Sequence, residues 1–243
     1  FIYEKRKPNA EKHAGLIEAC RDCMEIPDSG SALECQKFIP FAEKIVEKLN
    51  MGKELEQIGF LSKFAYLLHY VGQYRETEKL FNSLLKIDRE RWGENHPEVA
   101  IGYSNMGSVY EEQGEYEKAK GLYEKSLRIC ERVLGEGHPD TASIYNNLGL
   151  VYAAQREYEK AEELFEKSLR VYERIMGENH PYTATSCSCL ASVYREQGKY
   201  VKAEELHQKS LRIRERALGE NHPDTANSYN SLALVYKEQG EYA

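Results

Sequence analysis

The chain has 243 residues and a formal net charge of -7 at pH 7, with 33 Lys and Arg against 40 Asp and Glu. General binding to phosphate groups requires clustered Lys and Arg, so we expect no nucleic-acid partner. No apolar run approaches the ~20 residues that a membrane-spanning helix needs, and we expect no membrane partner.

The first 52 residues predict a helical lead-in. Apolar residues at helical spacing predict a helix over 10–26, which Pro27-Asp28-Ser29-Gly30 ends. Ser31-Ala32-Leu33-Glu34 is a capping box, a pattern that starts a helix. Pro40 lies inside this second helix and should kink or split it, because proline lacks the backbone N–H and clashes with the preceding turn.

Residues 53–71 and 75–92 predict two helices joined by a turn at Gly72-Gln73-Tyr74. Several residues of this pair recur 42 positions later. They are Gly72, Tyr74, Leu80 and Leu85, which return as Gly114, Tyr116, Leu122 and Leu127. The pair is a degenerate copy of a repeated unit, as we expect at the end of a solenoid.

From Trp92 onward the period is strictly 42 residues. Four His-Pro pairs each follow a Gly-Glu pair and precede a predicted helix: His96-Pro97, His138-Pro139, His180-Pro181 and His222-Pro223. Glycine in a left-handed conformation can end the preceding helix, and proline suits the first position of the next one. The histidines have no companion metal ligands and no nucleophile or base beside them. We therefore interpret them as structural residues of the corner between two helices.

Each repeat predicts a helix A and a helix B. Spacings of three and four place the large apolar residues of each helix on one face, and a small residue allows close approach of the neighbouring helix. The core positions of the unit that starts at Pro139 are Tyr145, Leu148, Gly149, Tyr152, Ala161 and Phe165. We interpret these tyrosines as core residues and predict no catalytic site, since no acid, base and nucleophile converge.

The pattern Tyr145-x-x-Leu148-Gly149-x-x-Tyr152, followed by Ala161-x-x-x-Phe165, resembles the tetratricopeptide repeat, with Tyr where Trp is usual. Each unit is longer than the usual ~34 residues, and this longer form resembles the repeats of kinesin light chains and their relatives. The resemblance implies an all-α fold, a right-handed superhelical solenoid of antiparallel helix pairs. It also implies a non-catalytic scaffold that binds a protein or peptide.

We therefore predict a lead-in or linker over 1–52 and a solenoid over 53–243. The predicted repeats cover about 53–94, 95–136, 137–178, 179–220 and, in part, 221–243. Because the chain starts at Phe1 rather than Met and stops within a repeat, we expect it to be an excerpt of a longer protein.

The six cysteines share no spacing that recurs with the repeat: Cys20, Cys23, Cys35, Cys130, Cys187 and Cys189. We therefore expect free thiols in a reducing compartment, and a cytoplasmic location. Cys20, Cys23 and Cys35 could supply three zinc ligands, and His13 is nearby, but a fourth ligand at the usual spacing is missing. We expect packing of helix faces there, with no metal and no cofactor.

Residues 10–60 show a second resemblance. A kinked helix with Ile39-Pro40-Phe41-Ala42, followed by an atypical first repeat, is similar to the segment that joins the nucleotide-binding domain of NB-ARC/STAND-type ATPases to their repeat arm. No P-loop pattern occurs, since Gly198-Lys199 is followed by Tyr200 and lacks the upstream glycine. The alternative function is therefore a ligand-sensing or autoinhibitory arm whose ATPase domain lies outside this chain.

The tetratricopeptide resemblance implies that the A helices line a concave groove, whereas the charged B helices face outward. The lining positions vary between copies while the core does not, which fits both specialisation and simple surface drift. The candidate partner-binding residues are Asn105, Ser108, Ser143, Asn146, Asn147, Leu150, Ser188, Ser192, Arg195, Asn227, Asn230, Leu234 and Lys237.

Two features of this set come from the resemblance. Asn146-Asn147 matches the paired asparagines that hold a peptide backbone in kinesin light chain-like grooves, whereas Ser188-Cys189 departs from that pattern. Leucines between the polar residues would offer apolar contact. A basic clamp for a carboxylate is poorly supported, because its only candidates, Arg195 and Lys237, are offset by neighbouring glutamates.

Overall fold

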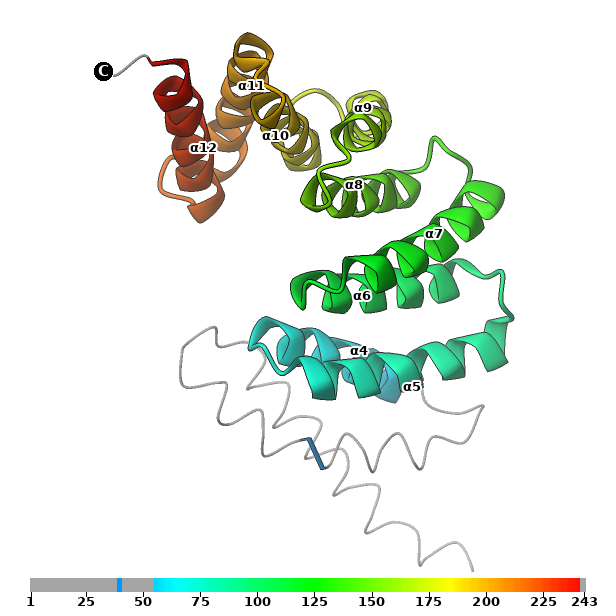
Figure 1. Cartoon of the computed structure of the whole chain (residues 1–243). Coiled ribbons are helices and arrows are strands. Elements are labelled where there is room, and N and C mark those ends of the chain that lie inside the picture. The colour runs from blue at the N-terminus through cyan, green and yellow to red at the C-terminus, as the bar shows by residue number, and fades with distance from the viewer. Residues whose placement is uncertain (1–38, 41–54, 241–243) are drawn as a thin grey trace, which may run out of the picture. The chain divides into compact units, whose positions relative to one another are not determined.

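The computed structural model describes residues 39–40 and 55–240, and its regular structure is helical throughout these ranges (Figure 1). The predicted helix over 10–26, the capping box at 31–34, the proline kink and the Cys20, Cys23, Cys35 and His13 set lie outside them or at their edge, so those predictions remain untested. Contacts divide the chain into two compact units, 1–94 and 95–243, which we describe separately.

The first unit contains one helix pair, α4 (Leu55–Tyr70) and α5 (Tyr74–Trp92). Leu61, Phe64 and Leu68 of α4 are buried, as are Leu80 and Phe81 of α5. The buried threonine that replaces the usual alanine of helix B, Thr77, donates its hydroxyl to the carbonyl of Gln73 at 2.9 Å. The pair therefore tolerates this polar substitution, because the hydroxyl keeps a hydrogen-bond partner.

The second unit is an array of A and B helices (Figure 1). Its helices are α6 (Pro97–Glu112), α7 (Tyr116–Val133), α8 (Pro139–Ala154), α9 (Tyr158–Ile175), α10 (Pro181–Glu196), α11 (Tyr200–Leu218) and α12 (Pro223–Gln239). Each B helix packs against its own A helix and against the next A helix along the chain. Such nearest-neighbour packing makes the unit a solenoid, in which the core continues from repeat to repeat.

The His-Pro corner joins each B helix to the next A helix. In the corner before α8, Gly135 has φ +88°, a left-handed conformation that ends the preceding helix. His138 is the N-cap of α8, and its Nδ1 accepts a hydrogen bond from the backbone N–H of Asp140 at 3.2 Å. Thr141 donates its hydroxyl to the carbonyl of Gly135 at 2.8 Å.

The same histidine cap recurs at the other three corners. The Nδ1 atoms of His96, His180 and His222 each accept from the backbone N–H two residues later at 3.2 Å. An N-cap acceptor satisfies one of the four N–H groups that a helix start leaves unpaired. The interpretation of the histidines as structural corners is confirmed.

A small residue in each A helix lies under a ring of its own B helix. A Cβ built on Gly149 would lie 2.7 Å from Cε1 of Phe165, and one built on Gly107 would lie 2.7 Å from Cε1 of Tyr123. Both distances are well below van der Waals contact, so the rings occupy the space that a side chain would need. The predicted role of the small residue in close helix packing is confirmed at these two positions.

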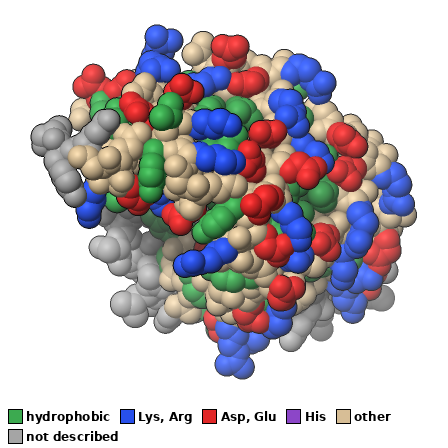
Figure 2. Space-filling view, turned by 45° about the horizontal axis from the view of Figure 1, so that its top comes forward, with side chains coloured by type: hydrophobic (Ala, Val, Ile, Leu, Met, Phe, Trp, Pro, Cys, Tyr) green, Lys and Arg blue, Asp and Glu red, His purple; other side chains and the backbone are tan. Residues whose placement is uncertain are grey.

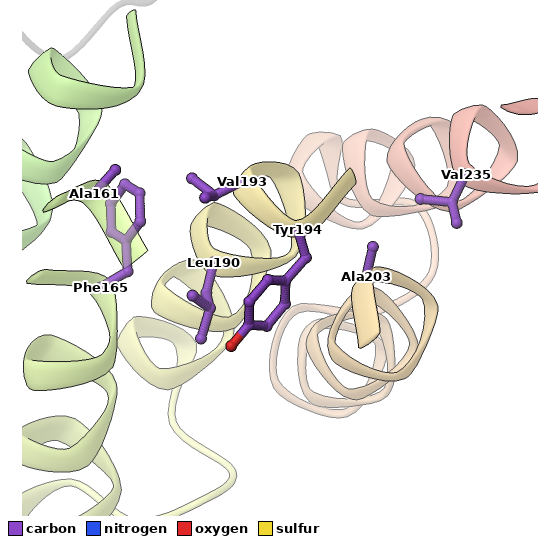
Figure 3. Packing of buried hydrophobic residues seen from close by; sticks show 7 residues of the cluster. All are labelled: Ala161, Phe165, Leu190, Val193, Tyr194, Ala203 and Val235. Atoms are coloured by element: carbon purple, nitrogen blue, oxygen red, sulfur yellow. The ribbon is translucent and has the colours of Figure 1, made fainter. Parts of the chain in front are cut away.

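One buried cluster shows how the core crosses repeat boundaries (Figure 3). Phe165 of α9 lies in the same cluster as Leu190, Val193 and Tyr194 of α10, and Val235 of α12 also belongs to it. The cluster therefore joins three successive repeats, which explains why a single repeat would not bury its apolar face alone.

His207 of α11 stands where the other B helices have Tyr123 and Phe165. It is 1 % exposed, and its Nδ1 atom has no hydrogen-bond partner in the described structure. Burial lowers the pKa of this imidazole to about 4, and the positive charges of Arg195 and Arg214 act in the same direction. His207 is therefore a neutral core residue at neutral pH.

The B helices carry most of the charged surface. Ion pairs one turn apart, such as Lys167–Glu163 at 2.8 Å and Arg170–Glu166 at 3.3 Å, follow α9. Acidic and basic side chains are interspersed on the face that Figure 2 shows. The pairs of α9 are solvent-exposed, and such exposed i,i+4 pairs stabilise a helix by only ~0.3–0.5 kcal/mol each. Across residues 55–240, no helix is both long and apolar enough to cross a bilayer.

We predict that Gly149→Ala lowers the free energy of unfolding by about 1–3 kcal/mol, because the added methyl overlaps the Phe165 ring. Gly121→Ala is the matched control, since nothing lies within 4 Å of a Cβ at that helical position. There alanine should be neutral or stabilising, by up to about 1 kcal/mol. Urea unfolding followed by circular dichroism measures both, and equal effects of the two variants would show that the close contact is misassigned.

We predict that His207→Leu makes the chain less sensitive to acid. The unfolded imidazole binds a proton near pH 6.5, whereas the folded one does so only near pH 4, so stability falls as the pH drops through this window. Between pH 7 and pH 4 the free energy of unfolding of the variant should improve relative to wild type by about 2–3 kcal/mol. Parallel pH profiles of the two proteins would contradict the burial of a neutral imidazole.

Candidate functional site

All the predicted partner-binding residues of the second unit lie on A helices. Asn105 and Ser108 are on α6; Ser143, Asn146, Asn147 and Leu150 on α8; Ser188, Ser192 and Arg195 on α10; and Asn227, Asn230, Leu234 and Lys237 on α12. The structure brings some of these residues into one pocket and separates others.

A pocket of about 360 Å³ lies between α8 and α10. Three predicted residues line it: Leu150, Ser188 and Ser192. The other lining residues are Ala153, Ala154, Arg156, Tyr158, Phe165, Cys189, Val193 and Glu196. The pocket therefore joins the A helices of two successive repeats with the turn that leads from α8 into α9.

The wall of this pocket is largely apolar. Leu150 is 41 % exposed, although it sits beside the core, and Phe165 and Val193 reach the pocket from the core itself. The hydroxyl of Ser192 donates to the carbonyl of Ser188 within α10 at 3.0 Å, so it is already partly satisfied. Such a surface favours an apolar group, because contact with Leu150 and Phe165 removes apolar area from water.

Arg156 contributes the unusual feature of the pocket. Among the described residues it is the one non-glycine residue with positive φ, at +62°. The equivalent positions 42 residues away are glycines, and Gly114 and Gly198 both have φ +73°. Its guanidinium is exposed and forms no ion pair within residues 55–240. Backbone strain of this kind is often found at functional sites, and Arg156 lines the pocket together with the carboxylate of Glu196.

Sequence analysis did not include Arg156, Tyr158, Cys189 and Glu196 among the candidates. Arg156 lies in the turn after α8 and Tyr158 is the first residue of α9, whereas the resemblance pointed to the A helices alone. A usable signal existed for Arg156, since it replaces a glycine that recurs in the other copies at 72, 114, 198 and 240.

Asn146 is largely buried and hydrogen-bonded within the protein. It is only 8 % exposed, and its amide Nδ2 donates to Oγ of Ser186 at 2.9 Å, while Ser186 can donate back to Oδ1 at 3.2 Å. Ser186 also lies 3.1 Å from the hydroxyl of Ser168. The three side chains form a buried polar link between α8, α9 and α10. These contacts use the polar atoms of Asn146 inside the protein, and the role of Asn146 in holding a peptide backbone stays a prediction.

Asn147 occupies a different environment. It is half-buried, and its Nδ2 donates to Oγ of Ser104 on α6 at a long 3.4 Å. Ser108 of α6 donates to the carbonyl of Asn105 at 2.9 Å. These contacts are weaker or local, so Asn147 can exchange its partner for a ligand at a smaller cost than Asn146.

The basic candidates of the set are compensated or exposed. Arg195 is 20 % exposed, and its Nη2 lies 2.6 Å from Oε1 of Glu196, with Glu238 at 3.9 Å from its Nε. Lys237 is exposed on α12. Two carboxylates beside Arg195 offset its charge.

The remaining candidates do not reach the pocket. Ser143 lies near the start of α8 and is exposed, and Asn227, Asn230 and Leu234 are exposed on α12. They lie on the A helices as predicted but form a separate part of the surface.

Burial shifts the pKa of several titratable groups in the second unit. Burial raises the pKa of the Cys187 thiol to about 11 and that of Cys189 to about 12. The hydroxyl of Tyr123 donates to Glu111 at 2.7 Å, and burial raises the pKa of both groups. These shifts keep the thiols protonated, so they are poor nucleophiles. Within the described ranges, no three His, Cys, Asp or Glu side chains are grouped so as to hold a metal ion.

The repeats and their packing define the class of protein. The model of the tetratricopeptide repeat family matches residues 58–132, 98–174, 140–188 and 182–243, which together cover most of the chain. The chain belongs to the tetratricopeptide repeat family. Repeats of this family generally serve as protein-interaction scaffolds.

Solved structures show the same fold at low sequence identity. The structure of BtubC (BKLC) from P. vanneervenii superposes with a TM-score of 0.70 at 24 % identity, covering 86 % of this chain and 83 % of that one. Two structures of kinesin light chain-type repeats from Podosopora anserina have TM-scores of 0.65 and 0.63 at 23 % and 20 % identity. They cover 76 % and 85 % of this chain, and 87 % and 97 % of their own. The comparison with curated proteins finds no match.

We predict that Asn146→Ala lowers the free energy of unfolding by about 1–3 kcal/mol, because it removes both hydrogen bonds between Asn146 and the buried hydroxyl of Ser186. Asn147→Ala is the matched control and should cost less than about 1 kcal/mol, since its hydrogen bond is long and half-exposed. Chemical denaturation of both variants is the measurement. A larger loss for Asn147→Ala would reverse our assignment of the two asparagines.

Proposed function

We propose that this chain is a non-catalytic scaffold that binds an extended peptide or protein segment in a groove lined by its A helices, in the cytoplasm. The observation that carries the proposal is the apolar pocket between α8 and α10, with Leu150 at its edge and Phe165 behind it. A volume of about 360 Å³ is near the lower end for ligand sites and suits one large apolar side chain with adjoining backbone.

Arg156 adds a charge preference to this pocket. An exposed guanidinium without an ion pair attracts a carboxylate, and its planar fork can bind one in a bidentate manner. A segment that carries an apolar residue close to Asp or Glu would satisfy both parts of the site. Asn147 and the serines beside it can provide hydrogen bonds to the backbone of such a segment.

The alternative function, a sensing or autoinhibitory arm of a STAND-type ATPase, depends on residues 10–60. Most of these lie outside the described ranges, and no observation on the A helices favours it over the scaffold.

The test starts from a random peptide library displayed on phage and selected against the immobilised chain. Enriched peptides are synthesised, and their affinity is measured by fluorescence anisotropy. Leu150→Arg should weaken binding at least about tenfold, because it places a charge against the apolar wall. Val133→Arg is the matched control: Val133 is 47 % exposed, much like Leu150, but lies outside the pocket.

Binding that survives Leu150→Arg and is lost with Val133→Arg would disprove the groove. The groove would also be disproved if the selection enriched no peptide that binds the chain saturably. Melting curves of both variants should match wild type, since both positions are exposed.

Arg156→Gly tests the charge preference separately. Glycine relieves the positive φ, so the free energy of unfolding should rise by about 0.5–1 kcal/mol. Affinity for selected peptides with Asp or Glu should fall, whereas affinity for their Asn or Gln versions should change little. If Arg156→Gly lowered the affinity for both kinds of peptide equally, Arg156 would not distinguish a charged peptide from a neutral one.

A further inference from the structure

A second pocket, with a volume of about 300 Å³, lies between the corner that precedes α8 and the second half of α9. We call it the basic pocket. Its lining residues are Glu136, Gly137, Tyr145, Lys167, Arg170, Val171 and Arg174. It shares no lining residue with the pocket between α8 and α10, so it is a separate site.

Positive charge prevails in the lining of the basic pocket. Lys167, Arg170 and Arg174 contribute three cations, whereas Glu136 is the single carboxylate among the lining residues. Lys167 and Arg170 each also pair with a glutamate one turn earlier in α9, at 2.8 and 3.3 Å. Such exposed pairs are weak, so another anion can replace the glutamate at little cost. The lining therefore favours an anion with more than one negative charge.

Arg174 is positioned by a backbone group of the corner. Its Nη2 donates to the carbonyl of Gly137 at 3.2 Å, and it forms no ion pair with another described residue. The acceptor is neutral, so the charge of the guanidinium and its other N–H groups stay available to a ligand. A Cβ built on Gly137 would overlap this guanidinium. Arg174 therefore reaches the corner only because residue 137 has no side chain.

Gly137 distinguishes this corner from the others. The three equivalent residues are asparagines, at positions 95, 179 and 221. Gly137 is not among the glycines with positive φ, so its backbone conformation does not require glycine. The departure from asparagine therefore concerns the space that Arg174 occupies, and it is confined to the corner that lines the basic pocket.

We propose that the basic pocket binds a phosphate group, carried by a phosphorylated side chain of a partner or by a free phosphate compound. The planar guanidinium of Arg174 can donate two parallel N–H groups to phosphate oxygens. Lys167 and Arg170 add charge from the next turns of α9. A phosphate monoester carries close to two negative charges at pH 7 and three acceptor oxygens, so it matches this lining better than a carboxylate does.

Phosphorus nuclear magnetic resonance tests the proposal with two probes, inorganic phosphate and N-acetyl-O-phosphoserine amide. Titration with the 243-residue chain in about 0.15 M salt should shift the probe resonance saturably, since distant charges are largely screened there. Tighter binding of the phosphoserine probe would identify a phosphorylated side chain as the source, and tighter binding of inorganic phosphate a free compound. Absence of saturation with both probes would overturn the proposal.

Gly137→Asn is the most specific variant, because the other three corners already carry asparagine there. It should weaken probe binding at least about tenfold, since the new side chain displaces Arg174. Arg174→Gln should have the same effect. Arg132→Gln is the matched control: Arg132 holds the same place in its repeat, with Asn95 at its corner, and lies outside the basic pocket.

The control variant should change the affinity less than about twofold, since screened charges outside the pocket contribute little. If Arg132→Gln and Arg174→Gln weakened binding equally, the probes would be attracted by the basic surface in general, and the proposal would be wrong. Unchanged affinity in Gly137→Asn would also overturn it, because the position of Arg174 would then not matter.

Discussion

The arrangement of the second unit depends on the contact between a small residue of helix A and a ring of helix B. Where Phe165 lies on Gly149, a Cβ would be 2.7 Å from the ring, so the two helix axes approach more closely than ordinary side chains allow. That approach buries the tyrosines and leucines on either side. It also leaves some side chains of the A helices exposed, such as Leu150 of α8.

The His-Pro corners connect successive helix pairs, so that the contact between a small residue and a ring recurs from repeat to repeat. Each corner ends a B helix with a left-handed glycine and starts the next A helix with a histidine cap, and all four caps have the same geometry. Within the second unit, each B helix packs on the next A helix along the chain. The shared cluster from Phe165 to Val235 is the result.

The candidate site shows a division between polar groups that hold the repeats together and groups that remain available. Asn146, Ser186 and Ser168 satisfy one another inside the protein. Leu150 and Arg156 instead leave an apolar side chain and an uncompensated charge at one pocket. The proposed binding site therefore lies in the third repeat and its neighbour, where Arg156 departs from the glycine of the other copies.

The sequence by itself determined the helix pairs, the 42-residue period, the corners and the small-residue contact, because each depends on local conformation or on a pattern that recurs in register. It also placed the candidate residues on the A helices. Only the tertiary structure decided which of them are accessible. Asn146 and Asn147 are adjacent in sequence and alike in chemistry, yet the neighbouring helix α10 buries the first and leaves the second half-exposed. The pocket likewise combines α8, α10 and the turn after α8, and its lining is set by packing between repeats, which periodicity within one repeat does not encode.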